Sequence, residues 1–466
     1  MPGVVPRAQG RRSRPGDLGG VAPRAATEGG SFVVGQQVEV TVEDVAQGGP
    51  CVARPAGLPV MFVRHALPGE RVVARVTEVT SKFARADAVE VLESSQDRVD
   101  APCPHARPGG CGGCDWQHAS LPAQRALKAA VITQQLKRLA GIDREVTVEP
   151  LPGPALDDPA ADGPAPAGLG WRTRVQFAVD RDGVAGLRGH RSHAVIDIGD
   201  CLIAHQAVRD LAIPADDWSG ATSVEVVVGG ADSTENFAVT VVEGGEKQKV
   251  KGRGPRNGGG RLTRPRRTLV EGRPYLAERA AGRLWQVGAD GFWQVHPAAA
   301  DTLSAAVVEA LAPRPGDTVL DLYCGAGLFA GAVAPLVGPE GAVTGIESDA
   351  AAVKNARQNL SDCPQATVTR ADVAQAAVAG DLPPARLVIA EPPRAGLARE
   401  LVAYLIGDSV AGDTTAERFA YVSCDPATLA RDLALLTGGG WRLERLRAFD
   451  AFPMTHHVEC VATLSR

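Results

Sequence analysis

Apolar and polar side chains alternate along residues 32–95, as they do in short strands that are buried on one face. Val38 and Val40 are spaced by two, and the dipeptides Gly48–Gly49 and Pro68–Gly69 are turn signals between such segments. Short strands that are joined by tight turns over about 60 residues predict a small β-barrel.

The period of the apolar positions changes at residues 121–140. Ile132, Leu136 and Leu139 follow a spacing close to 3.6 residues, which predicts an amphipathic helix. Alternating segments return between residues 171 and 295, so we expect a second β-rich region there.

From about residue 297 onward, apolar strands alternate with helices. A helix is expected at 298–312, and buried strands are expected at 318–323, 342–347, 367–370 and 387–390. Alternation of this kind predicts a parallel, doubly wound α/β sheet. Two further apolar segments, at 419–422 and 458–464, would complete the sheet.

These patterns divide the chain into four parts. Residues 1–30 contain few large apolar side chains, cannot bury enough surface to fold, and are expected to form a disordered tail. The other parts are the β-barrel at 31–95, a central β-rich domain at 96–295 and a Rossmann-like α/β domain at 296–466.

The formal net charge of −5 at pH 7 excludes a uniformly basic nucleic-acid-binding protein. One run differs from the rest, because residues 247–267 hold nine Lys or Arg and no acid. Such a run can neutralise phosphates. It can equally be a solvated loop, which the glycines at 258–260 would allow, so both interpretations stay open.

The chain has no run of about 18 apolar residues, so we expect no transmembrane helix. Its N-terminus lacks the apolar stretch of a secretory signal. We therefore expect a cytoplasmic protein without a membrane partner, in which the nine cysteines are not disulfide-bonded. Their uneven spacing indicates a metal or cluster site together with candidate catalytic thiols.

A glycine-rich segment, Asp321-Leu-Tyr-Cys-Gly-Ala-Gly327, ends a predicted strand and opens a helix. Glycines there let the backbone turn tightly and approach a ligand closely. Glu347 ends the next strand, where a carboxylate can accept hydrogen bonds from both hydroxyls of a ribose. The acid before the turn would repel the phosphates of a dinucleotide but suits a cationic amino-acid moiety, which favours S-adenosylmethionine. Asp372 ends the third strand and can either reach an adenine or serve as a helix N-cap.

Three further segments follow or precede apolar strands near the C-terminus. Cys424 ends one strand at the carboxyl edge of the sheet, where ligands bind in open α/β folds, although most cysteines in such strands are core residues. The segment Glu391-Pro-Pro-Arg394 follows another strand at the same edge. Glu459 opens the last strand, and its spacing alone does not tell whether it faces solvent or the pocket.

Five motifs stand in a fixed order: Gln294 in Phe-Trp-Gln-Val-His, the turn at Asp321, Pro392-Pro-Arg, Ser423-Cys-Asp-Pro and His457-Val-Glu. Together they resemble the RNA uracil-5-methyltransferase family, over about residues 32–466. That family includes enzymes for the transfer RNA T-loop and for large-subunit ribosomal RNA. The resemblance implies a class I S-adenosylmethionine-dependent fold, and it identifies residues 32–95 as similar to the RNA-binding TRAM β-barrel.

The family resemblance also implies a mechanism. The Cys424 thiolate adds to carbon 6 of a flipped-out uracil, carbon 5 takes the methyl group, and Glu459 removes the carbon 5 proton before the cysteine leaves. The cofactor contacts that it implies are Gln294, Tyr323, Glu347, Asp372 and Glu391. Glu391 is a departure, since the family usually has the shorter Asp before Pro-Pro-Arg. Two more departures are Leu328 and His296, where Asn is usual.

Cys103, Cys111 and Cys114 are separated by seven and two residues, and Cys201 lies far downstream. Four thiolates suit either zinc or an iron–sulfur cluster, and spacing does not decide between them. The stretch is similar to the [4Fe–4S] motif of the ribosomal-RNA branch, although that branch usually has five residues in the first gap. The resemblance therefore predicts a [4Fe–4S] cluster of structural or RNA-positioning function, and it favours ribosomal over transfer RNA.

Two other classes of function fit part of the sequence. A noncatalytic RNA-binding protein could keep the same fold, but the combination of Cys424 and Glu459 argues against it. An iron–sulfur redox protein would use the cysteine set and would not depend on Cys424. No obligate protein partner is evident, so RNA is the expected partner.

Overall fold

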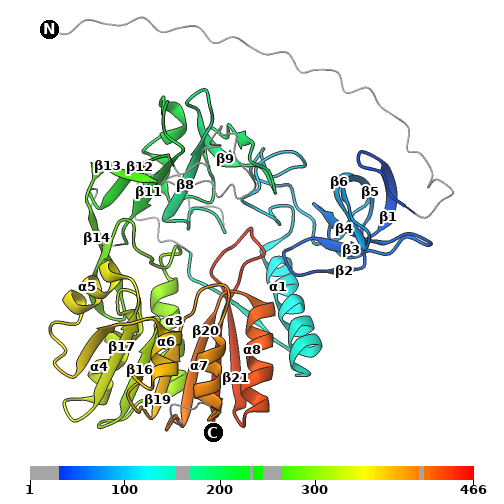
Figure 1. The fold of residues 1–466 in the computed structure, drawn as a ribbon. Helices are drawn as coiled ribbons and strands as arrows, with labels where there is room; N and C mark the ends of the chain where they lie inside the picture. The colour runs from blue at the N-terminus through cyan, green and yellow to red at the C-terminus, as the bar shows by residue number, and fades with distance from the viewer. Residues whose placement is uncertain (1–30, 154–167, 231–234, 245–264, 409–413) are drawn as a thin grey trace, which may run out of the picture.

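The structure is a computed structural model that describes residues 31–153, 168–230, 235–244, 265–408 and 414–466. The predicted tail at 1–30 and most of the basic run at 247–267 lie outside the described residues. Figure 1 shows the rest as an α/β domain, with a β-rich domain beyond one end of its sheet and a small β domain to the side.

The small β domain is a six-stranded sheet with the order β1-β5-β6-β4-β3-β2. Its strands are β1 (Gln37–Thr41), β2 (Asp44–Val45), β3 (Cys51–Ala53), β4 (Val60–Arg64), β5 (Arg71–Val79) and β6 (Phe83–Glu93). The register between β5 and β6 shifts at three places, and such bulges curve a sheet around its own apolar face. Val38, Val40 and Val42 are buried on that inner face. We call this domain the barrel.

The central region contributes a second six-stranded sheet, of order β10-β9-β8-β11-β12-β13, and a separate hairpin of β14 and β15. The strands are β8 (Arg174–Val179), β9 (Ala185–Arg188), β10 (Val195–Ile196), β11 (Ser223–Val228), β12 (Phe237–Glu243), β13 (Arg266–Gly272), β14 (Tyr275–Ala280) and β15 (Arg283–Gly288). Two short helical turns, α2 (Gln206–Arg209) and η2 (Ile213–Ala215), lie between β10 and β11. The sequence prediction of a second β-rich region is confirmed.

The α/β domain is built on an eight-stranded sheet of order β18-β17-β16-β19-β20-β22-β21-β7. Its strands are β16 (Thr318–Leu322), β17 (Ala342–Glu347), β18 (Ala366–Arg370), β19 (Leu387–Ala390), β20 (Arg418–Ser423), β21 (Arg442–Asp450), β22 (Glu459–Ser465) and β7 (Val148–Pro150). Its helices are α3 (Ala299–Leu311), α4 (Leu328–Val337), α5 (Ala350–Asn359), α6 (Val373–Ala379), α7 (Arg399–Ile406) and α8 (Pro426–Gly438). Two apolar clusters divide the helices between the two faces of the sheet.

The prediction of a wholly parallel sheet is wrong at one end. β22 runs antiparallel to β20, and β21 pairs antiparallel with β22. β21 was not predicted because its sequence, Arg-Leu-Glu-Arg-Leu-Arg-Ala-Phe-Asp, is mostly polar, and only its last three residues are buried. β7 is three residues long and comes from the middle of the chain, where no periodicity shows it.

The predicted helix at 121–140 consists of α1 (Leu121–Gln135), capped by Ser120, and a short π-helix η1 (Leu136–Ala140). It packs against α8 and the sheet, and Ile132 and Leu136 belong to the apolar core of the α/β domain. The segment thus joins the α/β domain, although it lies between the barrel and the central sheet in the sequence. No described helix is long and apolar enough to cross a membrane.

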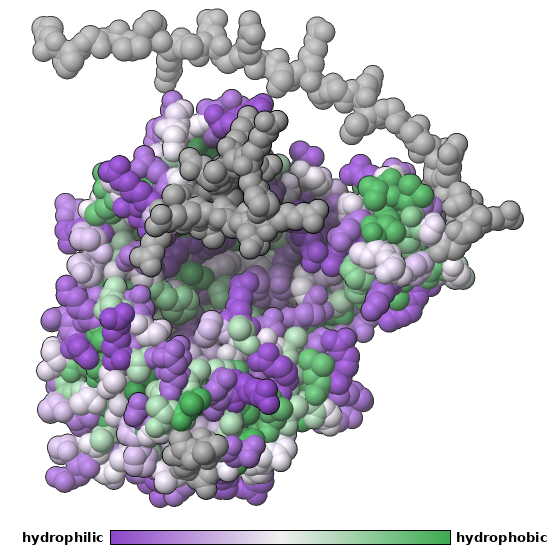
Figure 2. All heavy atoms as spheres, viewed as in Figure 1, coloured by the Kyte–Doolittle hydropathy of each residue, from purple (hydrophilic) through white to green (hydrophobic). Residues whose placement is uncertain are grey.

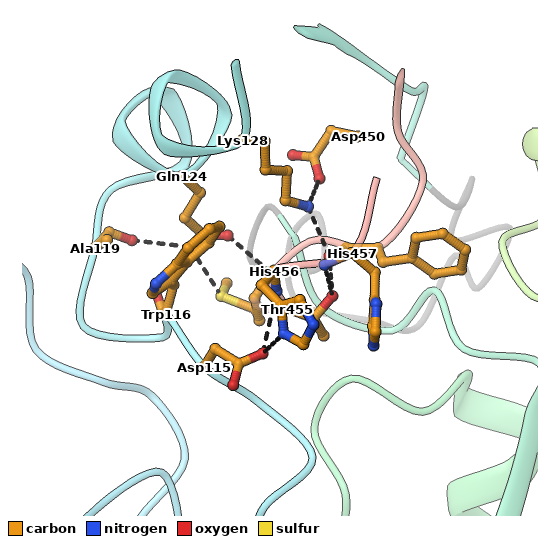
Figure 3. Close-up of polar contacts among 11 residues, drawn as sticks. Asp115, Trp116, Ala119, Gln124, Lys128, Asp450, Thr455, His456 and His457 are labelled. Atoms are coloured by element: carbon orange, nitrogen blue, oxygen red, sulfur yellow. Dashed lines mark hydrogen bonds and ion pairs between the residues drawn. The ribbon is translucent and has the colours of Figure 1, made fainter. Parts of the chain in front are cut away.

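One ion pair under α1 is almost completely removed from solvent. Lys128 Nζ lies 2.5 Å from Asp450 Oδ1 and donates to the Phe452 carbonyl at 3.0 Å, and the two charged residues are 1% and 2% exposed. Asp450 ends β21, so the pair fixes α1 to the start of the loop that leads to β22 (Figure 3).

We predict that Lys128→Met lowers the free energy of unfolding by about 3–5 kcal/mol, because it leaves the Asp450 carboxylate buried without its cation. Chemical denaturation of the full chain measures this. Lys137→Met is the matched control on the same helical segment, since the Lys137–Asp143 pair is exposed and such pairs contribute about 0–1 kcal/mol. Equal, small losses in both variants would contradict the prediction.

Candidate active site

The carboxyl ends of four parallel strands meet at one edge of the α/β sheet. β16, β17, β19 and β20 are in parallel register, so the residues that end or follow them come together there. These residues are Tyr323, Glu347, Glu391 and Cys424. Figure 2 shows that the surface is hollowed between the α/β domain and the central β-rich domain. The sequence-predicted cofactor and nucleophile residues therefore occupy a common edge.

The turn after β16 is strongly bent. Tyr323, Gly325 and Gly327 have φ values of 62°, 54° and 92°, and a non-glycine residue in this left-handed region is typical of functional sites. The backbone N–H of Gly325 donates to Glu347 Oε2 at 3.1 Å, while Glu347 Oε1 accepts from the Asp349 N–H. Glu347 is thereby held beside the turn and stays partly exposed.

Asp321, the acid before this turn, is completely buried. Its Oδ2 accepts from the Ala330 N–H at 2.9 Å, but its Oδ1 has no hydrogen-bond partner among the described residues. Burial raises the pKa of Asp321 to about 8, and the nearby charges of Glu391 and Glu347 add to this. A buried carboxyl oxygen without a partner suits a ligand that brings a positive charge or a donor.

Glu391 stands where the family has the shorter Asp, and it still makes a strong contact. Gln294, which is 5% exposed, donates from Nε2 to Glu391 Oε1 at 2.6 Å. Burial raises the pKa of Glu391 to about 7, and this hydrogen bond opposes the rise. The hydrogen bond between Glu391, which follows β19, and Gln294, which follows β15, therefore accommodates the extra methylene of Glu391.

Asp372 lies close enough to Tyr323 for its charge to act on the phenol. Asp372 is exposed and accepts from the Gln375 N–H at 3.0 Å, so it serves as the N-cap of α6. Burial raises the pKa of the partly buried Tyr323 to about 12, and the charge of Asp372 acts in the same direction. Asp372 is thus a helix N-cap, which was one of the two interpretations of the sequence. An N-cap carboxylate can also reach an adenine.

Cys424 and Glu459 lie side by side because of the antiparallel pairing of β20 with β22. Ser423, the last residue of β20, is opposite Cys460, so the residue after one strand adjoins the first residue of the other. Cys424 is partly exposed and Glu459 is 5% exposed. The structure thus brings the predicted nucleophile and the predicted base together.

Burial and neighbouring charges raise the pKa values of both groups. Burial, and next the charge of Glu459, raises the pKa of the Cys424 thiol to about 11. Burial also raises the pKa of Glu459 well above its ordinary value, and Glu391 adds to this. Arg394, from the Pro-Pro-Arg segment, lowers the pKa of both groups, and its Nη2 lies 3.5 Å from His457 Nε2.

The loop that leads into Glu459 is held by residues that the sequence analysis did not single out. His456 donates to Asp115 Oδ2 from its backbone N–H at 3.1 Å, and its Nδ1 lies 2.6 Å from the same oxygen (Figure 3). The Met454 N–H donates to Gln124 Oε1 at 2.7 Å. These partners are more than 300 positions apart in the sequence, so no local pattern predicts them.

Cys103, Cys111, Cys114 and Cys201 line one cavity between the 103–117 segment and the central sheet. Gln117 crosses the segment, since its Oε1 accepts from the Cys103 N–H at 3.0 Å and its Nε2 contacts Cys114 Sγ at 3.1 Å. Among the described residues, no three His, Cys, Asp or Glu side chains are arranged to hold a metal ion. A zinc ion with four sulfurs at about 2.3 Å would require the thiols to converge on one point. They surround a space instead.

Comparison with known proteins places this geometry in a family. Family models match residues 32–89 (TRAM domain), 297–409 (methyltransferase small domain) and 383–466 (tRNA (Uracil-5-)-methyltransferase). An uncharacterized RNA methyltransferase of Streptomyces coelicolor is 48% identical over 447 residues, which is 93% of each chain. One of Streptomyces avermitilis is also 48% identical and covers 92% of this chain and 98% of its own. The chain belongs to the RNA uracil-5-methyltransferase family. It is an S-adenosylmethionine-dependent RNA methyltransferase.

A solved structure shows the same architecture across the methyltransferase. The tRNA (uracil-54, C5)-methyltransferase of Pyrococcus abyssi, in complex with S-adenosyl-L-homocysteine, superposes with a TM-score of 0.62 at 23% identity. The match covers 92% of this chain and 100% of that one. The class I fold with an N-terminal TRAM barrel is therefore confirmed.

The raised pKa of the buried Glu459 carboxyl can be tested through its effect on the stability of the protein. The pKa of Glu459 is raised above 4.5 in the folded protein, so folding takes up a proton, and burying the charge destabilises the fold increasingly as the pH rises above 4.5. We predict that Glu459→Gln stabilises the cofactor-free protein by on the order of 1–3 kcal/mol at pH 8. The difference shrinks as the pH falls towards 4.5.

Thermal unfolding of both proteins between pH 5 and pH 8 measures this difference. Glu417→Gln is the control, because Glu417 is an exposed partner of Arg386 far from the pocket. If the Glu459 variant is less stable than the parent at pH 8, the raised pKa is wrong.

Proposed function

We propose that this chain transfers a methyl group from S-adenosylmethionine to carbon 5 of a uridine in RNA through a covalent adduct with Cys424. The adjacency of the partly exposed Cys424 thiol and the buried Glu459 carboxyl, beside the Gly325 turn, supports this most directly. The cysteine serves as the nucleophile, and the glutamate serves as the general base.

Carbon 5 of uracil is a weak nucleophile, and Cys424 overcomes this. Its thiolate forms a bond to carbon 6 of the flipped-out base, and the electron pair of the carbon 5–carbon 6 double bond moves onto the carbon 4 oxygen. Carbon 5 of the resulting enolate would take the methyl group of bound S-adenosylmethionine. The methyl–sulfur bond of the donor would break with its electron pair staying on the sulfur, so that S-adenosylhomocysteine leaves. Arg394 favours the thiolate, because its positive charge lowers the pKa of Cys424.

Glu459 completes the reaction. Once carbon 5 carries both a methyl group and its original proton, the carboxylate takes that proton, the double bond re-forms and the Cys424–carbon 6 bond breaks. Its raised pKa makes Glu459 a stronger proton acceptor than an exposed glutamate. The positive charge of the bound methyl donor favours the ionised form of this carboxyl before the reaction begins.

The methyl donor would be held by the residues around the Gly325 turn. Glu347 would accept from the ribose hydroxyls, and Asp372 with Tyr323 would lie at the adenine. The Gln294–Glu391 pair and the unpartnered Oδ1 of Asp321 would face the amino-acid end. The buried carboxyls of this set fit a ligand whose amino group and sulfur are both cationic.

We predict that Cys424→Ala abolishes transfer of labelled methyl to RNA, by a factor of at least about 10³, because no other group activates carbon 5. Cys363→Ala is the control, since Cys363 is a buried cysteine beside Arg283 and away from the pocket. Methyl transfer that survives in Cys424→Ala would refute the covalent mechanism.

Glu459→Ala should have a different defect. The adduct forms and carbon 5 is methylated, but the proton is not removed, so the protein stays attached to RNA. We expect this variant to accumulate a covalent complex that withstands denaturing electrophoresis, whereas Cys424→Ala and Cys424→Ala/Glu459→Ala form none. Full turnover by Glu459→Ala would assign the base to another residue.

The four cysteines would hold a [4Fe–4S] cluster that positions the 103–117 segment. Their position around a single cavity supports this, because thiolates of four cysteines are the usual ligands of such a cluster. The cysteine pattern favours ribosomal RNA as the substrate. The proposed site of the reaction is the cytoplasm. The tRNA enzyme named above shares the fold, so the choice between ribosomal and transfer RNA has to be tested. Both kinds of RNA are isolated from cells that lack this protein, and transfer of labelled methyl to each is measured.

We predict that protein purified without oxygen contains about four iron atoms per chain, and that Cys114→Ser loses this iron because four thiolates are needed. Absorbance and iron analysis measure both. Cys51→Ser is the control, since Cys51 lies inside the barrel. A preparation with one zinc per chain and no iron would contradict the cluster.

A further inference from the structure

One turn of the barrel reaches the catalytic edge of the α/β domain. Residues 46–50 connect β2 with β3, and Gln47 donates from Nε2 to Asp425 Oδ2 at 3.1 Å, across 378 positions of sequence. The Trp116 indole donates to the Gly49 carbonyl at 2.9 Å. The turn is therefore bonded both to the cysteine-rich segment and to the residue that follows Cys424.

Asp425 directly follows the predicted nucleophile Cys424. It is the N-cap of α8, and its Oδ1 accepts from the Thr428 N–H at 2.8 Å. Its other oxygen, Oδ2, accepts from Gln47. Both oxygens of the carboxylate are thus held, one by the helix and one by the barrel, directly after Cys424.

The same turn also lies against the segment that leads into Glu459. Gly49 has a φ of 94°, and a Cβ added there would lie 3.0 Å from His456 Cβ and 3.4 Å from Asp115 Cβ. Asp115 holds His456 through the two contacts described above. Arg64 of the barrel strand β4 lies 3.9 Å from the same carboxylate. A side chain at position 49 would therefore press against this loop, so the turn and the loop are in close contact.

The orientation of Gln47 is unusual for a side chain with only a packing function. Its Oε1 is buried without a hydrogen-bond partner among the described residues, although buried polar atoms usually have one. The Nε2 must face Asp425, because a carboxylate accepts hydrogen bonds and does not donate them. The contact with Asp425 is thus retained although it leaves the other end of the amide unsatisfied.

We propose that Gln47 of the barrel is a positioning residue for Cys424, and that the barrel thereby completes the catalytic centre as well as contacting RNA. The inference rests on the proposed function, since it assumes that Cys424 is the nucleophile. Gln47 acts through Asp425: it fixes the carboxylate that caps α8 and so the direction of the preceding thiol towards carbon 6 of the base.

The test uses the full chain and RNA transcribed with 5-fluorouridine, as a mixture of large-subunit ribosomal RNA and transfer RNA. Fluorine at carbon 5 leaves no proton to remove, so the methylated adduct cannot break down and its rate of formation reports the nucleophile. For Gln47→Ala, this rate at saturating RNA should fall at least about 10-fold, because small misplacements of reacting groups have effects of that size. The dissociation constant for RNA should change less than about threefold.

Gln134→Ala is the matched control. Gln134 of α1 donates to Asp44 Oδ2 at 2.7 Å, so it fastens the same end of the barrel without touching a catalytic segment. Its adduct rate should equal that of the parent protein. Two results overturn the proposal: an unchanged adduct rate in Gln47→Ala, or an equal fall in Gln134→Ala, which would mean that barrel docking in general is responsible.

The variant Gln47→Glu tests the pH dependence of adduct formation, which loss of packing alone would not change. The charged groups that act on Cys424 are Glu459, Arg394, Glu391 and Asp425, and a further carboxylate beside Asp425 adds negative charge. The pH at which adduct formation is half-maximal should therefore shift upward in Gln47→Glu and stay unchanged in Gln47→Ala. An unshifted profile in Gln47→Glu would overturn the proposal.

The parent protein separates this inference from the function on which it rests. If the parent forms no adduct with the 5-fluorouridine RNA, the proposed function fails. If the parent and Gln47→Ala form the adduct equally fast, only the role of Gln47 fails.

Discussion

The reversed direction of β22 is the constraint on which the catalytic centre depends. In a parallel sheet every strand begins at the amino edge, so a residue that opens a strand lies far from the ligand edge. Because β22 runs antiparallel to β20, its first residue, Glu459, starts at the carboxyl edge, where Cys424 follows β20. A slip of one residue in this pairing would turn the Glu459 side chain to the other face of the sheet. The register of one antiparallel strand pair therefore brings the two groups together.

The buried acids of the pocket destabilise the protein when no cationic ligand is bound. Asp321, Glu391 and Glu459 are carboxyls whose pKa values are raised by burial, and Arg394 is the cation that acts on Glu459 and Cys424. A cationic ligand relieves this arrangement, because its charge favours the ionised form of each acid. In the proposed function, the same acids that weaken the cofactor-free fold would favour a sulfonium donor over a phosphate-bearing dinucleotide.

The loops at this edge are fixed by segments from the N-terminal third of the chain. The barrel, the cysteine-rich segment and α1 all bond to the loop between Asp450 and Glu459 or to the turn after Cys424. The Lys128–Asp450 pair and the Asp115–His456 pair lie on either side of the loop (Figure 3). The order of domains along the chain gives no indication that the N-terminal third of the protein supports the proposed catalytic residues near the C-terminus.

Sequence periodicity predicted the strands β16, β17, β19 and β20 well, because each is a buried apolar run next to a glycine or proline signal. It did not predict β21, whose exposed half is rich in arginine and glutamate, nor the direction of β22, which depends on β21. The position of Glu459 relative to the pocket stayed open for the same reason. Motif order supplied the candidate residues, whereas contacts such as Gln47–Asp425 arise only from tertiary packing.

The covalent mechanism is tested most directly by identifying the protein atom that is bonded to RNA. The trapped complex with 5-fluorouridine RNA is digested with protease and nuclease, and the cross-linked peptide is sequenced by mass spectrometry. A methylated fluorouracil on the sulfur of Cys424, within Tyr-Val-Ser-Cys-Asp-Pro, is the expected product. A cross-link on Cys324, Cys460 or any other residue would contradict it.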